Sequence, residues 1–486
     1  MTVKKIAAAL CALAIVLSAP VGASAAETDW PQFLGSPSAS GLTGAKTPVN
    51  AASAGQIWTV KHNITSEYNG AKYENNACGT PIAVGGCVYI TTADGKLLKL
   101  DAATGKTAAS AECPNVPPYF SQIAFGDGKI YVPQQTSAGV QISAFDAESP
   151  ARVWQSEVIA YGKSAQQIAS PVTYYDHRIY FGTYTQDAAT YAYTSGVFVC
   201  MDTASGKTAW MHENTSAGYY WNGGAVTGAA IAVSDTAGNI TAYRLTDGVA
   251  AGAASAGGPV SSTLCFAQGR LYASVKSGYI YSVKADANGM IYGSTAVKSA
   301  VLGNDITSSP VVYNNRLYVA GGGYNAATPF SVLDAGSLKT IYQISGIRSQ
   351  SSPLVSTAYA ADGNHRQVYI YVAKYGSLDE NYAFTKDSSC VYVISDRAGQ
   401  TKPSFETLFT PSVPQSSSQS LVPSGDGSLF YFNDSGSLYA IGKKAPLPSP
   451  KTGEGPAAMG AAVVMLSAAA VFAFLKRHNF GNSHEI

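Results

Sequence analysis

The sequence contains little charge. Of its 486 residues, 31 are Lys or Arg and 30 are Asp or Glu, so only 13% are charged, compared with roughly 25% in an average soluble protein. The formal net charge is +1. A charge so low and balanced creates no long-range field that would attract nucleic acid, so we expect no nucleic-acid partner. The 46% of hydrophobic residues excludes a disordered chain.

The residue patterns that usually carry catalysis are also missing. The six histidines of the chain are scattered, with no His-x-His or His-Glu-x-x-His spacing for a metal ion. There is no Cys-x-x-Cys pair, no Gly-x-Ser-x-Gly elbow before a helix, and no glycine-rich phosphate loop. We therefore predict no metal site and no catalytic residue.

Cysteine is sparse as well. Six cysteines follow the first 26 residues, and most lie in or beside apolar strand segments: Cys78, Cys87, Cys113, Cys200, Cys265 and Cys390. These positions favour free buried thiols, although one disulfide remains possible.

Both ends of the chain carry targeting signals. Residues 1–26 combine two lysines, a short apolar run and a small-residue cleavage site, which predicts a secretory signal peptide. Residues 457–475 are uncharged and would span about 28 Å as a helix, which predicts a transmembrane segment. The basic tail that follows, residues 476–486, is expected on the cytoplasmic side, so the body faces outward.

Residues 444–456 are rich in proline and are expected to form a stalk. Their Ser-Pro-Lys-Thr-Gly pentapeptide, followed by an apolar run and a basic tail, resembles a cell-wall sorting signal of Gram-positive bacteria. The resemblance implies that a sortase cleaves between Thr452 and Gly453 and transfers the protein to peptidoglycan. The alternative is a single-pass anchor that is never cleaved.

Between these ends the sequence repeats. Short strands with period-2 alternation, separated by Gly- and Asp-containing turns, recur about every 45 residues or a multiple of that interval. We count eight copies, with insertions at 185–195 and 375–389. Their first strands are expected to begin near Pro81, Ile123, Pro171, Ala225, Ser262, Pro310, Pro353 and Val422.

Such repeats predict an all-β, eight-bladed β-propeller that forms one domain over residues 27–443. The last copy has only three strands, so residues 57–60 are expected to complete it and close the ring. The Asp that follows the third strand of each repeat is expected to bond backbone amides in the next turn.

The repeat ending Asp-x-x-x-Gly-Lys-x-x-Trp at 202–210, together with the opening segment 29–35, resembles the pyrroloquinoline-quinone-type (PQQ-type) propeller repeat. Members include quinone-dependent alcohol dehydrogenases and non-catalytic envelope scaffolds. The resemblance implies, for an enzyme, a pair of adjacent cysteines, a tryptophan floor and carboxylates for calcium. This chain has no Cys-Cys pair, and Trp58, Trp154 and Trp210 close repeats, so we predict no cofactor.

The loops that precede the first strand of each repeat should share one face, and they are rich in Tyr, Trp, Asn, Gln and Ser. We predict a ligand-binding face there, formed by Tyr119, Gln122, Gln167, Tyr220, Trp221, Asn222, Asn304, Asp305, Arg348, Gln350 and Gln419. Aromatic planes beside amides suit a glycan or a peptide. The predicted function is therefore non-catalytic binding of a polymer or protein. A divergent PQQ-dependent dehydrogenase and a passive envelope scaffold remain alternatives.

Overall fold

The computed structural model describes residues 29–62, 65–68, 71–74, 79–92, 94–117, 122–161, 165–322, 328–377, 384 and 389–443, without the side chains of 65–68 and 71–74. The predicted signal peptide, stalk, membrane span and sorting site all lie outside the described residues. Within the described part of the chain, no helix is long and apolar enough to cross a membrane.

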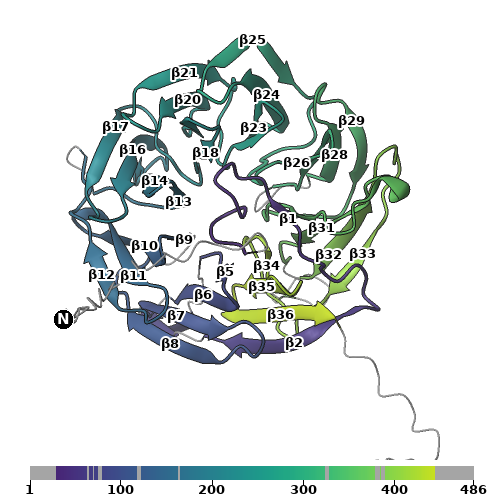
Figure 1. Cartoon of the computed structure of the whole chain (residues 1–486), viewed down its shortest axis with the longest axis horizontal. Helices are drawn as coiled ribbons and strands as arrows, with labels where there is room; N and C mark the ends of the chain where they lie inside the picture. Colours follow the sequence, from purple (N-terminus) through teal and green to yellow (C-terminus); the bar gives the residue numbers. More distant parts are fainter. Residues whose placement is uncertain are drawn as a thin grey trace, which may run out of the picture. The chain divides into compact units, whose positions relative to one another are not determined.

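The body is a ring of eight antiparallel β-sheets around a central axis, as Figure 1 shows. Blade 1 contains β5 (Ile82–Val84), β6 (Cys87–Thr92), β7 (Lys96–Asp101) and β8 (Thr107–Glu112). Blade 2 contains β9 (Ala124–Gly126), β10 (Lys129–Thr136), β11 (Gly139–Asp146) and β12 (Arg152–Gln155). Blade 3 contains β13 (Thr173–Tyr175), β14 (Arg178–Gly182), β16 (Tyr193–Asp202) and β17 (Thr208–Asn214), with the short β15 (Thr185–Gln186) in the predicted insertion. Blade 4 contains β18 (Ala225–Val226), β19 (Ala230–Ser234), β20 (Asn239–Arg244) and β21 (Ala250–Ser255).

The second half of the ring repeats this pattern. Blade 5 contains β22 (Cys265–Ala267), β23 (Arg270–Val275), β24 (Tyr279–Ala285) and β25 (Ile291–Lys298). Blade 6 contains β26 (Val311–Tyr313), β27 (Arg316–Val319), β28 (Phe330–Asp334) and β29 (Thr340–Ile344). Blade 7 contains β30 (Leu354–Ser356), β31 (Val368–Ala373), β32 (Val391–Asp396) and β33 (Phe405–Phe409), plus β1 (Leu42–Thr43), which pairs in parallel with β30. Blade 8 contains β34 (Val422–Pro423), β35 (Leu429–Asn433), β36 (Ser437–Lys443) and β2 (Ala54–Lys61). A hairpin of β3 (Thr65–Tyr68) and β4 (Ala71–Glu74) and the short 3-10 helix η1 (Asp362–Asn364) lie outside the blades.

The eight-bladed propeller predicted from the repeats is confirmed, and each inner strand begins close to its expected start. Ring closure is confirmed too, because β2 pairs antiparallel with β36 as the fourth strand of blade 8. This pairing joins the first part of the domain to the last, so the ring cannot open without breaking a sheet.

Outer-strand tryptophans join neighbouring blades. The indole Nε1 of Trp58, Trp154 and Trp210 each donates a hydrogen bond to a carbonyl in the next blade, at 3.0, 2.9 and 3.3 Å. Each indole also covers a glycine of that next blade, and Gly206 lies beneath Trp154. The repeat's Gly-Lys-x-x-Trp pattern therefore encodes an interface between blades, and the prediction that these tryptophans are structural is confirmed.

Gly206 has a φ of +68°, and a Cβ added there would lie 2.6 Å from Cε3 of Trp154. We expect Gly206→Ala to lower the free energy of unfolding by about 2 kcal/mol, from backbone strain and displacement of the indole. Gly346→Ala is the matched control, because Gly346 has a φ of +84° with open space around it. Equal losses for the two variants in chemical unfolding would contradict the packing argument.

The repeat Asp behaves as predicted in four blades. The carboxylates of Asp101, Asp146, Asp202 and Asp334 each accept a backbone N–H three residues ahead, at 2.7–2.9 Å. The prediction is wrong for Asp396. The Asp396 carboxylate is fully buried and takes part in contacts between blades 6 and 7 instead.

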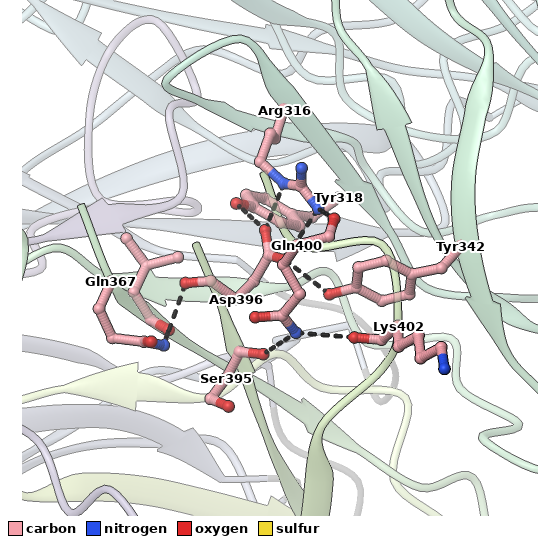
Figure 2. Close-up of polar contacts among 9 residues, drawn as sticks. Arg316, Tyr318, Tyr342, Gln367, Ser395, Asp396, Gln400 and Lys402 are labelled. Atoms are coloured by element: carbon pink, nitrogen blue, oxygen red, sulfur yellow. Dashed lines mark hydrogen bonds and ion pairs between the residues drawn. The ribbon is translucent and has the colours of Figure 1, made fainter. Parts of the chain in front are cut away.

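Asp396 pairs with Arg316 of β27, whose Nε and Nη2 lie 2.5 and 2.9 Å from the two carboxylate oxygens. The hydroxyls of Tyr318 and Tyr342 donate to the same carboxylate at 2.8 and 2.9 Å, and Figure 2 shows all three side chains converging on it. A buried charge is costly unless it is paired and hydrogen-bonded, which explains why Asp396 departs from the local turn pattern.

The segment from Trp30 to Gly41 crosses the ring at the ends of the inner strands, near the centre of Figure 1. It makes hydrogen bonds of 2.7–3.1 Å with inner strands of blades 1, 2, 3, 4, 5 and 7: Trp30 N–Ala83 O, Phe125 N–Pro31 O, Tyr174 N–Gln32 Oε1, Val226 N–Pro37 O, Phe266 N–Ser38 O and Val355 N–Gly41 O. This crossing segment was not foreseen, and it covers one end of the central channel.

Of the six cysteines, five are described and all five are free thiols: Cys87, Cys113, Cys200, Cys265 and Cys390. All but Cys87 are buried. The expectation of free thiols is therefore confirmed for these five, while Cys78 lies outside the described residues.

Candidate functional site

The central channel contains a small cavity of about 30 Å³, room for roughly one or two water molecules. Phe33 of the crossing segment forms part of its lining. The rest comes from the loops that precede the inner strands: Thr80, Gln122, Trp221, Ser262, Thr307, Ser309, Gln350, Ser352, Ser418, Gln419 and Ser420. None of these side chains is charged, so the cavity presents hydroxyls, amides and two aromatic rings.

A chain of hydroxyl–amide hydrogen bonds links the blades around this cavity. Gly223 N donates to Thr263 Oγ1 at 3.2 Å, and Thr263 N donates to Ser309 Oγ at 3.0 Å. Ser309 N in turn donates to Ser352 Oγ at 2.9 Å, and Ser352 N to Ser420 Oγ at 3.0 Å. Each hydroxyl satisfies a buried amide of the preceding blade, so the wall of the cavity is held rigidly.

Two buried polar atoms at the cavity have no hydrogen-bond partner among the described residues. They are Oε1 of Gln122, whose side chain is 8% exposed, and Oγ1 of Thr307. An unsatisfied buried acceptor costs roughly 1–3 kcal/mol, so both atoms would gain from a ligand hydroxyl or amide. By contrast, Gln419 Oε1 accepts from Thr80 Oγ1 at 2.6 Å.

Trp221 connects the cavity to an aromatic cluster formed by Tyr184, Tyr193, Tyr220 and Trp221. The ring of Tyr220 stacks on Trp221 with centroids 4.8 Å apart, and on Tyr193 at 5.1 Å. Tyr184 meets Tyr220 edge to face at 5.2 Å. Burial raises the pKa of Tyr184 to about 12 and also raises the pKa of Tyr193 and Tyr220, so these hydroxyls stay protonated.

The structure brings together only part of the predicted site. Gln122, Trp221, Gln350 and Gln419 line the cavity, and Tyr220 supports Trp221 from the aromatic cluster. Tyr119 lies outside the described residues.

Two further predicted residues do not line the cavity. Asn222 is fully buried, and its Nδ2 donates to Ser234 Oγ at 2.9 Å and to Val260 O at 3.1 Å. Gln167 forms a two-way backbone bridge with Tyr184.

The three remaining residues do not line the cavity. Asp305 pairs with Lys276 at 3.4 Å, and the Arg348 guanidinium lies over the ring of Tyr375 at 5.2 Å. Asn304 is exposed.

Sequence reasoning missed the hydroxyl lining. A signal was present, because Thr80, Ser309 and Ser352 each directly precede a proline that opens an inner strand. These prolines predict where the inner strands begin, but they do not by themselves indicate that the hydroxyls before them face the channel. The role of Phe33 had no such signal, since it depends on where the crossing segment runs.

A tricarboxylated quinone with calcium, the cofactor of similar quinone enzymes, does not fit these residues. The cavity is far below the roughly 300–1,000 Å³ of typical ligand sites, and its lining offers no cation for the carboxylates. Within the described ranges, no group of three or more His, Cys, Asp or Glu side chains is placed to hold a metal ion. We derive no chemical step through this cofactor.

The fold is an eight-bladed β-propeller that resembles the propellers of PQQ-dependent enzymes and of BamB. The family model described as outer membrane protein assembly factor BamB matches residues 43–251. No curated protein matches the chain.

Solved structures of the same fold include two quinohemoprotein alcohol dehydrogenases and BamB. The quinohemoprotein alcohol dehydrogenase of Comamonas testosteroni matches with a TM-score of 0.61 at 12% identity, covering 88% of this chain and 83% of that one. The enzyme ADHIIG of Pseudomonas putida HK5 gives 0.58 at 12% identity, with coverage of 88% and 83%. BamB of Moraxella catarrhalis gives 0.53 at 12% identity, with coverage of 80% and 99%. At such identities the comparison shows a shared fold, and function has to be argued from the site.

Proposed function

We propose that this protein is a non-catalytic binding propeller that holds an uncharged, hydroxyl-rich polymer, a glycan, across the mouth of its channel. The observation that carries the proposal is the cavity itself: a small pocket lined by hydroxyl and amide groups, with Trp221 among them and no charged side chain.

Its chemistry suits a neutral sugar ring. The indole of Trp221 offers an apolar plane to the C–H face of a sugar. The unsatisfied oxygens of Gln122 and Thr307 are buried below the mouth, so they would be bridged to the sugar hydroxyls by water held in the cavity. Because the cavity has room for little more than water, the ligand lies over the mouth instead of entering the channel. A peptide is the alternative occupant, and the binding assay below includes it.

A passive envelope scaffold is the second candidate. The family match and the structural similarity to BamB, an assembly factor by name, favour it. A scaffold would need the propeller only as a rigid body, so changes at the cavity would leave its association with other proteins intact.

Replacing Trp221 with alanine should reduce glycan binding at least tenfold, because the ligand loses its aromatic plane, while melting stays within a few degrees of the wild type. Binding would be measured with the full chain against neutral oligosaccharides, cell-wall glycan and unstructured peptides. Tyr292→Ala is the control, since Tyr292 is 45% exposed on β25 and lies outside the cavity lining.

If the Trp221→Ala variant binds the glycan as tightly as the wild type does, the cavity mouth is not the binding site. Capture of peptides alone would replace the glycan with a protein ligand at the same mouth.

The proposed location follows from the termini. We propose that residues 1–26 direct export, that residues 457–475 anchor the chain, and that a sortase joins Thr452 to peptidoglycan after cleavage before Gly453. Mass spectrometry of protein released from the cell surface should find Thr452 as the last residue. If the released protein still contains Gly453 and the residues after it, the chain is not cleaved there and the single-pass membrane anchor is supported instead.

A further inference from the structure

A second hollow lies on blade 7, and it shares no residue with the channel cavity. It is an open groove of about 650 Å³, within the range of ligand sites. Its walls are the loop between β30 and β31 and the loop between β32 and β33, which contribute His365 and Arg397 with Lys402 respectively.

The groove concentrates positive charge in a protein that has little charge. Three of its lining residues are basic, and none is acidic. Arg397 and Lys402 are both exposed, and neither takes part in an ion pair among the described residues. Two cations and a histidine thus share one groove in a chain that has only 31 Lys and Arg residues.

The wall that carries these cations is rigid. Arg316, held by the buried Asp396, also donates from Nη2 to Gln400 O at 2.9 Å. The Gln400 side chain in turn donates to Ser395 O at 3.0 Å and to Lys402 O at 2.9 Å. Figure 2 shows the Gln400 side chain bonded to Ser395 and Lys402 beside Arg316 and Asp396, so the turn that carries Lys402 is tied to the buried ion pair.

The opposite wall is fastened to the same turn. Ala398 N donates to His365 O at 2.9 Å, and Gln367 Nε2 donates to Asp396 O at 3.0 Å. His365 and Arg366 both have left-handed backbones, with φ of 56° and 55°, a strained conformation that the surrounding bonds maintain. The basic side chains are thus presented on a preorganised frame, which lowers the entropic cost of binding.

We propose that this groove binds a phosphate group, either free or esterified to a small polyol. The two positive charges of Arg397 and Lys402 match the charge of about −2 on a phosphate monoester or free phosphate better than the single charge of a carboxylate. Arg397 supplies a planar fork of donors for two phosphate oxygens, and Lys402 supplies a point charge. The hydroxyls of Ser395 and Ser404 offer neutral donors beside the anion.

Calorimetric titration of the full chain at low ionic strength tests the proposal, with inorganic phosphate, glycerol 3-phosphate and glycerol as probes. We expect both phosphates to bind and glycerol not to bind. The double variant Arg397→Ala/Lys402→Ala should weaken phosphate binding at least tenfold. Tighter binding of glycerol 3-phosphate than of inorganic phosphate would identify an esterified ligand, and the reverse order a free one.

Lys339→Ala is the matched control, because Lys339 is an exposed lysine of blade 6 outside the groove. It should leave the affinity unchanged. The proposal would be overturned if neither phosphate gave binding heat, or if Lys339→Ala lowered the phosphate affinity as much as the double variant does. Both altered residues of the double variant are exposed, so its melting curve should match that of the wild type.

Discussion

Replacing Arg316 with methionine should lower the free energy of unfolding by about 3–5 kcal/mol, the largest effect we expect from one substitution. The change leaves the carboxylate of Asp396 fully buried without its cation, and only the hydroxyls of Tyr318 and Tyr342 still donate to it. The loss of the bond to Gln400 O also loosens the turn behind the basic groove. Chemical unfolding followed by tryptophan fluorescence measures the effect.

Arg244→Met is the matched control, because Arg244 pairs with Asp247 at 2.6 Å on the surface, where both side chains are about half exposed. A surface pair contributes roughly 0–1 kcal/mol, so its loss should be small. If Arg316→Met costs no more than Arg244→Met, the buried pair does not stabilise the joint between blades 6 and 7. The double variant Arg316→Met/Asp396→Leu should recover much of the loss, since it leaves no unpaired buried charge.

Asparagine in place of Asp434 should make the protein more stable at pH 8 while changing little at pH 4. Asp434 lies in the turn between β35 and β36, and burial raises the pKa of its carboxyl from 3.8 to about 7. Between these two values the folded chain holds a proton that the unfolded chain has released. The stability that this proton provides is complete below about pH 4 and is lost as the pH rises through 7.

A shift of this size corresponds to at most about 4 kcal/mol between low and high pH. Asparagine does not ionise, so melting temperatures of the Asp434→Asn variant should exceed those of the wild type increasingly from pH 5 to pH 8. Glu406→Gln, at an exposed position on β33, is the control. Its melting temperature should change with pH in the same way as that of the wild type. A constant offset between the Asp434→Asn and wild-type curves would show that Asp434 is ionised in the folded protein at all these pH values.

Local patterns were enough to predict the blades. The spacing between repeats, counted on the Asp after the third strand, placed the inner strands. The missing fourth strand of the last copy predicted the closing role of β2, which the pairing with β36 confirms. The same reasoning failed at Asp396, because its carboxylate bonds to side chains of blade 6. One of them, Arg316, is 80 residues away in the sequence. A turn motif contains no information about a partner so distant in the chain.

The candidate site was predicted only in part, because repeat spacing gives the position of a residue but not the direction of its side chain. Gln122, Trp221, Gln350 and Gln419 could be grouped because each lies just before an inner strand, and the ring brings all such positions to the channel. Asn222 occupies the same kind of position, but its side chain turns into the wall, toward Ser234. The direction of one side chain depends on neighbouring packing, which repeat spacing does not specify.

The sequence by itself determined the number of blades, the order of their strands and the low charge of the loop face, because each follows from local periodicity and composition. Only the tertiary structure decided that the Trp30–Gly41 segment crosses the channel, that its lining is built from hydroxyls, and that three basic residues share one groove on blade 7. These features arise where segments far apart in the chain meet. Their free energy comes from contacts that exist only once the ring has closed.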